Sequence, residues 1–84
     1  MDGLFINDGT IEVMSNEFLL NCDLDLSSGT ILGSQAFAIP AYNGTIMQNC
    51  SSCVATLNNI QALYINHSSN FLGQVILNAP QYRR

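Results

Sequence analysis

The chain has 84 residues, enough for one small domain, and 48% of them are hydrophobic, which is too apolar for a disordered segment. Its formal net charge is −4, from six acidic and two basic side chains with no lysine among them. A surface that could neutralise phosphates is therefore missing, and nucleic-acid binding is not expected. Because so small a domain buries only about 60% of its unfolded surface, we expect oligomerisation to supply part of its stability.

The charges are distributed unevenly along the sequence. All acidic residues lie at or before Asp25, and the two basic residues are Arg83 and Arg84. Between Leu26 and Tyr82 the sequence has no Asp, Glu, Lys or Arg. Free surfaces of small domains usually carry mixed charges. We therefore expect this stretch to be covered in the working state, either by copies of the same chain, with a trimer as one option, or by a larger partner.

No targeting or membrane segment is recognised. The chain opens without the basic and apolar regions of a secretory signal, and no apolar run approaches the roughly 18 residues of a membrane span. We expect a cytoplasmic protein or a virion component that makes no contact with a membrane. Three sequons, at Asn43, Asn49 and Asn66, would matter only in a secretory pathway.

Short strands separated by turns are predicted for the N-terminal part. Leu4–Ile6 and Thr10–Met14 flank Asp8-Gly9, a dipeptide that favours hairpin turns, so we expect a first hairpin here. From Glu17 to Leu26 the apolar residues alternate with others, which predicts a strand with one face in the core and one in solvent. The expected core face is Phe18, Leu20, Cys22, Leu24 and Leu26, and the solvent face carries the carboxylates of Glu17, Asp23 and Asp25.

Turn residues continue to divide the chain after Leu26. Ser27-Ser28-Gly29 precedes a strand-like run, Pro40 ends the run Ala36–Ile39, and Asn43-Gly44 is a second hairpin-turn signal before Thr45–Met47. A last strand is predicted over Gln74–Leu77, and residues 81–84 are expected to form a tail.

A short repeat accompanies these turns. The sequence Gly-Thr-Ile begins at Gly9, Gly29 and Gly44, and Gly73-Gln74-Val75 is a weaker fourth copy. Ile31, Ile46, Ile60 and Val75 are then 15, 14 and 15 residues apart. This spacing suggests either regular strand–turn units or the coils of a small β-solenoid.

The segment Ser51–Asn66 fits two structures. Its apolar residues fall near helical spacing after a serine that could cap a helix, which favours one short amphipathic helix. Asn58-Asn59 favours a turn, and Ala62–Ile65 suits a strand equally well, so a strand is the preferred prediction. Overall we predict one all-β domain over residues 1–84, a small compact β-sandwich or barrel of short strands that is oligomeric.

Three cysteines and one histidine provide the ligand types and count of a closed structural zinc site. The set is Cys22, Cys50, Cys53 and His67. Only Cys50 and Cys53 form a close pair, and Cys22 lies in an alternating strand as a small core residue would. A thioredoxin-like centre would need a strand-to-helix context and nearby positive charge. We therefore expect reduced cysteines without a metal or cofactor, and a small zinc-binding module stays an alternative.

Catalytic chemistry is not predicted. His67 precedes Ser68 and Ser69, but neighbouring histidine and serine residues do not make a triad, and every carboxylate lies far upstream in the sequence. Asp23 and Asp25 share a strand face that could bind Ca²⁺, yet no calcium-binding loop accompanies them. We therefore expect no catalytic residue and a protein that is not an enzyme.

One local resemblance points to a structural role. The segment Leu24-Asp25-Leu26-Ser27-Ser28-Gly29-Thr30-Ile31-Leu32-Gly33 resembles the strand, turn and Gly-Thr-x-Leu-Gly segment of the small capsid decoration (cement) proteins of tailed phages and related viruses, and it covers ten of 84 residues. The resemblance implies a trimer-like oligomer on a capsid lattice that clamps neighbouring shell subunits without catalysis. Uncharged strands with exposed edges are consistent with docking onto another protein, because an unpaired strand edge promotes aggregation until another strand pairs with it.

The competing prediction is an adhesive or fibre module, such as a β-solenoid segment of a tail fibre or of a secreted glycoprotein. It rests on the recurrence of Gly-Thr-Ile and on the sequons. A solenoid repeats its core positions and packs only neighbouring repeats, whereas a cement protein needs one compact core and an extended docking edge. The mass of the native protein, with glycans attached or with a shell protein bound, would separate the two.

Overall fold

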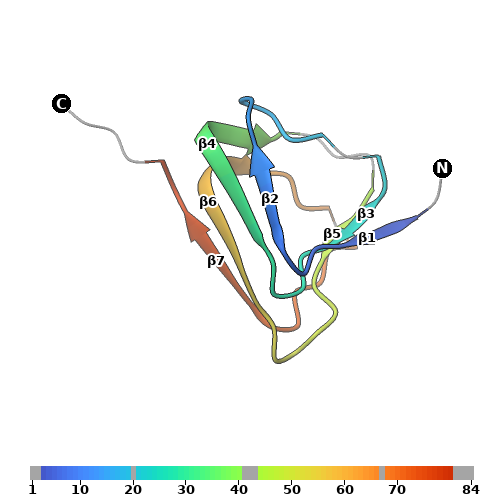
Figure 1. Cartoon of the computed structure of the whole chain (residues 1–84). Helices are drawn as coiled ribbons and strands as arrows, with labels where there is room; N and C mark the ends of the chain where they lie inside the picture. Colours follow the sequence, from blue (N-terminus) through green and yellow to red (C-terminus); the bar gives the residue numbers. More distant parts are fainter. Residues whose placement is uncertain (1–2, 20, 41–43, 67, 81–84) are drawn as a thin grey trace.

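The structure is a computed structural model that describes residues 3–19, 21–40, 44–66 and 68–80 (Figure 1). The described part contains seven strands and no helix, which confirms the all-β prediction. The strands are β1 (Leu4–Ile6), β2 (Thr10–Val13), β3 (Asp23–Asp25), β4 (Thr30–Ile39), β5 (Ile46–Met47), β6 (Val54–Leu63) and β7 (Gln74–Asn78).

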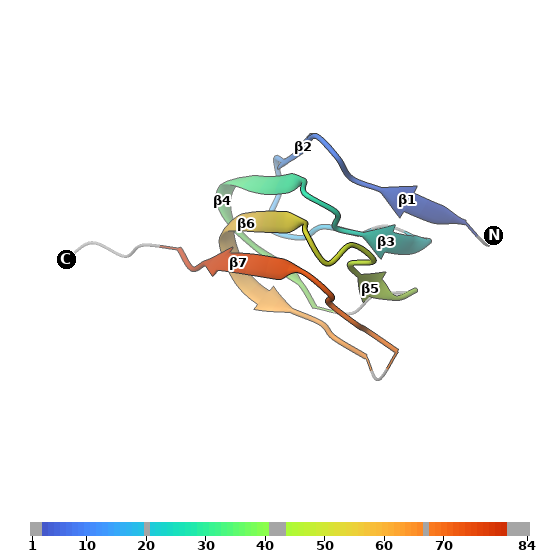
Figure 2. The ribbon, with the colours of Figure 1, turned by 90° about the horizontal axis from the view of Figure 1, so that it is seen from below.

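Two parallel sheets are built from strands that alternate along the chain. One sheet has the order β1-β3-β5 and the other has the order β2-β4-β6-β7, and every pairing between these strands is parallel. Each of the first three coils of the chain thus adds one strand to each sheet, and Figure 2 shows the strands of each sheet stacked in sequence order. The last coil adds Phe71, which bridges to Gln48, and then β7. The fold is therefore β-solenoid-like.

The core consists of columns of side chains that run from coil to coil. Thr10, Thr30 and Thr56 are partners in successive strands, so the residues that follow them, Ile11, Ile31 and Leu57, are also in register. Ile31 and Leu57 are buried, whereas Ile11 at the end of the column is half-buried. Partners in register share one face of a sheet, so each apolar position stacks on its counterpart and removes it from water.

The turns between the two sheets contain a fully buried amide. The Gln48 side chain donates from Nε2 to the carbonyl oxygens of Ser27, at 2.9 Å, and of Gln74, at 3.2 Å. Its Oε1 accepts a hydrogen bond from the backbone N–H of Gly73 at 2.9 Å. Gln48 therefore joins three successive coils, and its polar atoms are satisfied although no part of it reaches solvent.

Two further buried polar residues lie at the same turns. Asn7 Nδ2 donates to the carbonyl oxygen of Thr30 at 3.3 Å, and Asn7 Oδ1 accepts from the backbone N–H of Gly9 at 3.2 Å. Asp25 Oδ1 accepts from the backbone N–H of Ser27 at 2.9 Å and of Asn49 at 3.4 Å. These short polar side chains replace backbone partners where the chain leaves one sheet for the other.

An irregularity interrupts the pairing of β4 with β6. Their register shifts between Leu32 and Phe37 and again between Phe37 and Ala38. Opposite the first shift, Asn59 has a φ of 68°, and its Nδ2 donates to the carbonyl oxygen of Gly33 at 2.8 Å. Asparagine tolerates this left-handed conformation better than most residues, and its side chain supplies the hydrogen bond that the bulged ladder loses. Phe37 is fully buried beneath the bulge.

The ambiguous segment Ser51–Asn66 forms β6, Val54–Leu63, and not a helix. The prediction of hairpins was wrong, because β1 and β2 lie in different sheets and β5 pairs in parallel with β3. Gly9 marks a real turn, but at that turn the chain passes from one sheet to the other and does not fold back on itself. Asn43 lies outside the described residues.

The predicted strand from Glu17 to Leu26 is much shorter in the structure. Only Asp23–Asp25 forms β3, and Glu17 makes an isolated bridge to Ala38. Leu24 and Leu26 are buried as predicted, and Leu20 lies outside the described residues. Asp25 was expected in solvent but is only 7% exposed, because its carboxylate accepts the two turn N–H groups described above.

The Gly-Thr-Ile repeat is partly a coil repeat. The copies at Gly9 and Gly29 are in register in neighbouring coils, whereas the copy at Gly44 leads into β5 in the other sheet. Ile31 pairs with Leu57 and not with Ile46, so the spacing of about 15 residues does not measure a coil. Residues in register are 19 apart at Leu4 and 26 apart at Thr30, mainly because β4 has ten residues where β2 has four.

Candidate functional site

The two ends of the coil stack carry the most exposed apolar strands. At the N-terminal end, all three residues of β1 are exposed, with Ile6 at 56%. β1 and β2 each pair on one side only, so both are edge strands. An apolar edge strand with free backbone N–H and C=O groups is a template for pairing with another strand.

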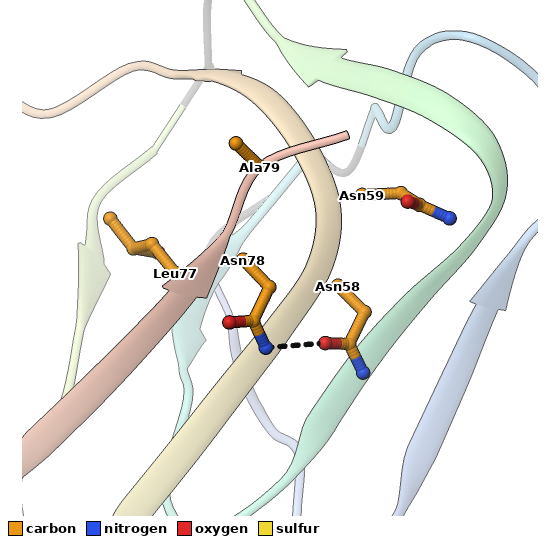
Figure 3. A pocket seen from close by; sticks show the side chains of 5 residues that line it. All are labelled: Asn58, Asn59, Leu77, Asn78 and Ala79. Carbon is orange, nitrogen blue, oxygen red and sulfur yellow. Dashed lines mark hydrogen bonds between the residues drawn. The ribbon is translucent and has the colours of Figure 1, made fainter. Parts of the chain in front are cut away.

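The other end of the stack is formed by β7 and has a shallow hollow of about 530 Å³. The hollow is lined by Asn58, Asn59, Leu77, Asn78 and Ala79 (Figure 3). Asn78 Nδ2 donates to Asn58 Oδ1 at 2.6 Å, and Figure 3 shows the Leu77 side chain on the opposite side of β7. The hollow therefore lies beside β6 and the C-terminal end of β7.

The lining of this hollow is neutral. It offers amide donors and acceptors together with the apolar carbons of Leu77 and Ala79, and none of its five side chains titrates. Such a surface can hold hydrogen-bonding and apolar groups, but it has no nucleophile and no group for proton transfer. Its chemistry suits the binding of another polypeptide.

Acidic side chains lie beside the N-terminal end. Glu12 of β2 is exposed, and exposed Asp8 accepts a hydrogen bond from the Ser27 hydroxyl, Oγ to Oδ1, at 2.7 Å. The two basic residues, Arg83 and Arg84, follow β7 in the sequence and lie outside the described residues. The acidic side chains that the structure describes thus lie in the first two coils.

The three cysteines of the alternative zinc site are free thiols. Cys50 and Cys53 bracket a tight turn in which the Cys53 N–H donates to the Cys50 carbonyl oxygen at 3.3 Å. The Cys53 thiol and then the Ser52 side chain lower the pKa of the Cys50 thiol below its usual value. Among the described residues no three metal-ligating side chains come together, and His67 lies outside them.

The other candidates take part in turns. Asp23 Oδ1 accepts the backbone N–H of Thr45 at 2.9 Å, so this carboxylate, like that of Asp25, joins neighbouring coils. The Ser68 N–H and the Ser69 hydroxyl both donate to Asn66 Oδ1, at 2.9 and 3.4 Å. These hydrogen bonds give each residue a role in holding the backbone.

The sequence analysis did not identify the amide side chains that join neighbouring coils. Asn58 and Asn78 form a ladder across β6 and β7, and Gln48 joins three coils, yet none of them belongs to a recognisable motif. A signal did exist, because Asn58 and Asn78 are separated by the same 20 residues as Thr10 and Thr30. Amide ladders between stacked strands are typical of assemblies that repeat along a sheet.

Comparison of the chain with protein-family models, with curated proteins and with solved structures found no match. Over the residues that the structure describes, no helix has the length and apolar character needed to cross a membrane.

Proposed function

We propose that this chain is a non-enzymatic structural module of a larger protein assembly, and that it serves as a segment of a fibre or adhesive protein. The observation that carries the proposal is the coil stack with an exposed edge strand at each end, β1 and β2 on one side and β7 on the other. Edges of this kind are stabilised when another polypeptide extends the sheet.

The architecture favours a fibre module over a capsid cement protein. Neighbouring coils contact each other in sequence order, as in a repeat protein, and the sheet grows in one direction. Most residues of the segment that resembles decoration proteins lie inside the stack, where Leu24, Leu26 and Ile31 are buried. Buried side chains build the coil and are not available to contact a shell, so this segment gives the decoration role little support.

The partners proposed are copies of the same chain and a larger fibre or shell protein. A neutral hollow and two apolar edges supply area and backbone hydrogen bonds for a polypeptide, and the hollow lacks the acid, base or nucleophile of a catalytic centre. The isolated domain should have a marginal stability, because a four-stranded sheet of this size buries a limited core.

Mass and thermal stability of the purified chain test this proposal. We expect the mean mass in sedimentation equilibrium to rise with protein concentration, and the midpoint of thermal unfolding to rise with it, since association stabilises only the folded state. A monomer mass at every concentration, together with a high unfolding temperature that does not depend on concentration, would contradict the proposal.

A further inference from the structure

We propose that two copies of this chain bind end to end, so that β2 of one copy continues the four-stranded sheet beyond β7 of the other. This inference rests on the proposed structural function and specifies its partner and its binding surface. It follows from the geometry of the two edges and from the continuation of the core columns.

The free edge of β7 has backbone groups positioned for another parallel strand. The Gln74 N–H donates to the Cys53 carbonyl oxygen at 3.0 Å, so Gln74 faces β6. Alternate residues of a strand direct their backbone groups to opposite sides, so Val75 and Leu77 direct theirs away from β6. β2 has its own free side opposite β4. The two edges therefore complement each other in strand direction and hydrogen bonding.

The core columns fix the register of this contact. Leu77 pairs with Leu57, which is buried in the column that also contains Ile11 and Ile31. Leu77 occupies the last position of this column and is 53% exposed. If the register inside the chain continues across the contact, Ile11 of the second copy stacks on Leu77 and completes the column.

The same register places a carboxylate beside the amide ladder. Glu12 follows Ile11, and Asn78 follows Leu77, so Glu12 of the second copy lies opposite Asn78. The Asn78 Nδ2 uses one hydrogen for Asn58 Oδ1 and has a second hydrogen for the carboxylate. A hydrogen bond to a charged acceptor is stronger than one between neutral groups.

The apolar surfaces of the two ends also complement each other. In the other sheet, the exposed side chains of β1 of the second copy would face the last coil of the first copy. In that coil Leu72 is exposed beside Phe71. Burial of these apolar side chains stabilises the contact.

A contact of this kind joins different surfaces of the two copies and does not close on itself. Heterologous contacts that do not close into a ring generate open filaments, and stacking coil on coil adds each copy along one direction. Because neighbouring strands are about 4.8 Å apart, a four-stranded unit would add roughly 19 Å to the filament. The prediction is a rod with strands perpendicular to its long axis.

Two matched substitutions test the contact. Leu77→Lys places a charge at the end of the column, whereas Leu32→Lys places the same charge on β4, within the stack, at a side chain that is 37% exposed. By sedimentation velocity over a range of concentrations, we expect Leu77→Lys to weaken association about tenfold or more, and Leu32→Lys to leave it unchanged. Circular dichroism checks that both variants are folded.

A substitution in β2 provides the second test and does not alter β7. Glu12→Lys should weaken association, because a lysine side chain cannot accept the second hydrogen of Asn78 Nδ2. If Leu32→Lys dissociates the assembly and Leu77→Lys and Glu12→Lys do not, copies associate side by side, so the end-to-end contact is wrong while the structural function stands. If the wild-type chain stays monomeric at every concentration, the end-to-end contact is wrong, and if it also unfolds at a high temperature that does not depend on concentration, the structural function fails as well.

Discussion

Single polar side chains hold successive coils together at the turns between the two sheets. Gln48, Asn7 and Asp25 are all buried, and each has a hydrogen-bond partner in the backbone of another coil. A buried polar group without a partner costs free energy, so these residues stabilise one register and penalise every other. Residues that hydropathy would place at the surface therefore determine how the coils align.

Gln48→Leu should lower the free energy of unfolding by about 3 kcal/mol or more. Leucine has a similar size, but it leaves the carbonyl groups of Ser27 and Gln74 and the N–H of Gly73 without the partners that Gln48 supplies, and each buried unpaired group costs about 1–3 kcal/mol. Urea unfolding measures the change. Gln61→Leu on the exposed side of β6 is the control and should alter the free energy by less than about 0.5 kcal/mol.

At the scale of the element, turn signals were easier to predict than strand partners. Gly9 and Gly29 were recognised as turn residues from the sequence, and both do lie at turns. The dipeptide Asp8-Gly9 fits a hairpin turn as well as a tight bend between two sheets, because both require a compact polar turn. Which partner a strand takes depends on contacts with residues about 20 positions away in the sequence. The few residues around a turn carry no information about those contacts.

A matched pair of glycines in register tests the packing of the inward columns. A Cβ at Gly29 would overlap the backbone oxygen and the side chain of Asn7, whereas a Cβ at Gly9 would have no atom within 4 Å. Gly29→Ala should therefore destabilise the fold by more than about 2 kcal/mol, because the backbone has to shift. Gly9→Ala should change the free energy of unfolding by less than about 1 kcal/mol.

Chemical denaturation of both glycine variants beside the wild type makes this comparison. Equal stability of Gly29→Ala and Gly9→Ala would show that the first two coils are not packed in the register of Thr10 with Thr30. Neither position has a left-handed φ, so backbone strain from the added side chain does not complicate the result.

At the scale of the whole molecule, the sequence predicted the class and much of the core but not the path of the chain. Leu24, Leu26 and Ile31 were expected in the core or in strands and are buried. Phe37 is buried under a bulge that depends on Asn59, and no local sequence pattern predicts this bulge. The hollow at β7 was not predicted, because it exists only where the stack stops.

Hydrogen exchange should reveal a gradient from the middle of the stack to its ends. In a solenoid each coil is stabilised by its neighbours, and the first and last coils have one neighbour only. The backbone N–H of Thr56, which donates to the Gly29 carbonyl oxygen between two inner strands, should exchange more slowly than that of Gln74 in β7. Protection that is uniform across the four-stranded sheet would contradict a stack of coils.

The direction of the hydrogen bonds between coils has a mechanical consequence. Strands in neighbouring coils lie side by side, so the backbone bonds that join them run along the direction in which the coils stack (Figure 2). Tension applied along that direction stretches one row of bonds at a time and does not shear many rows together. A thread made of such coils would yield by peeling, one turn after another, and would lengthen gradually under load before it broke.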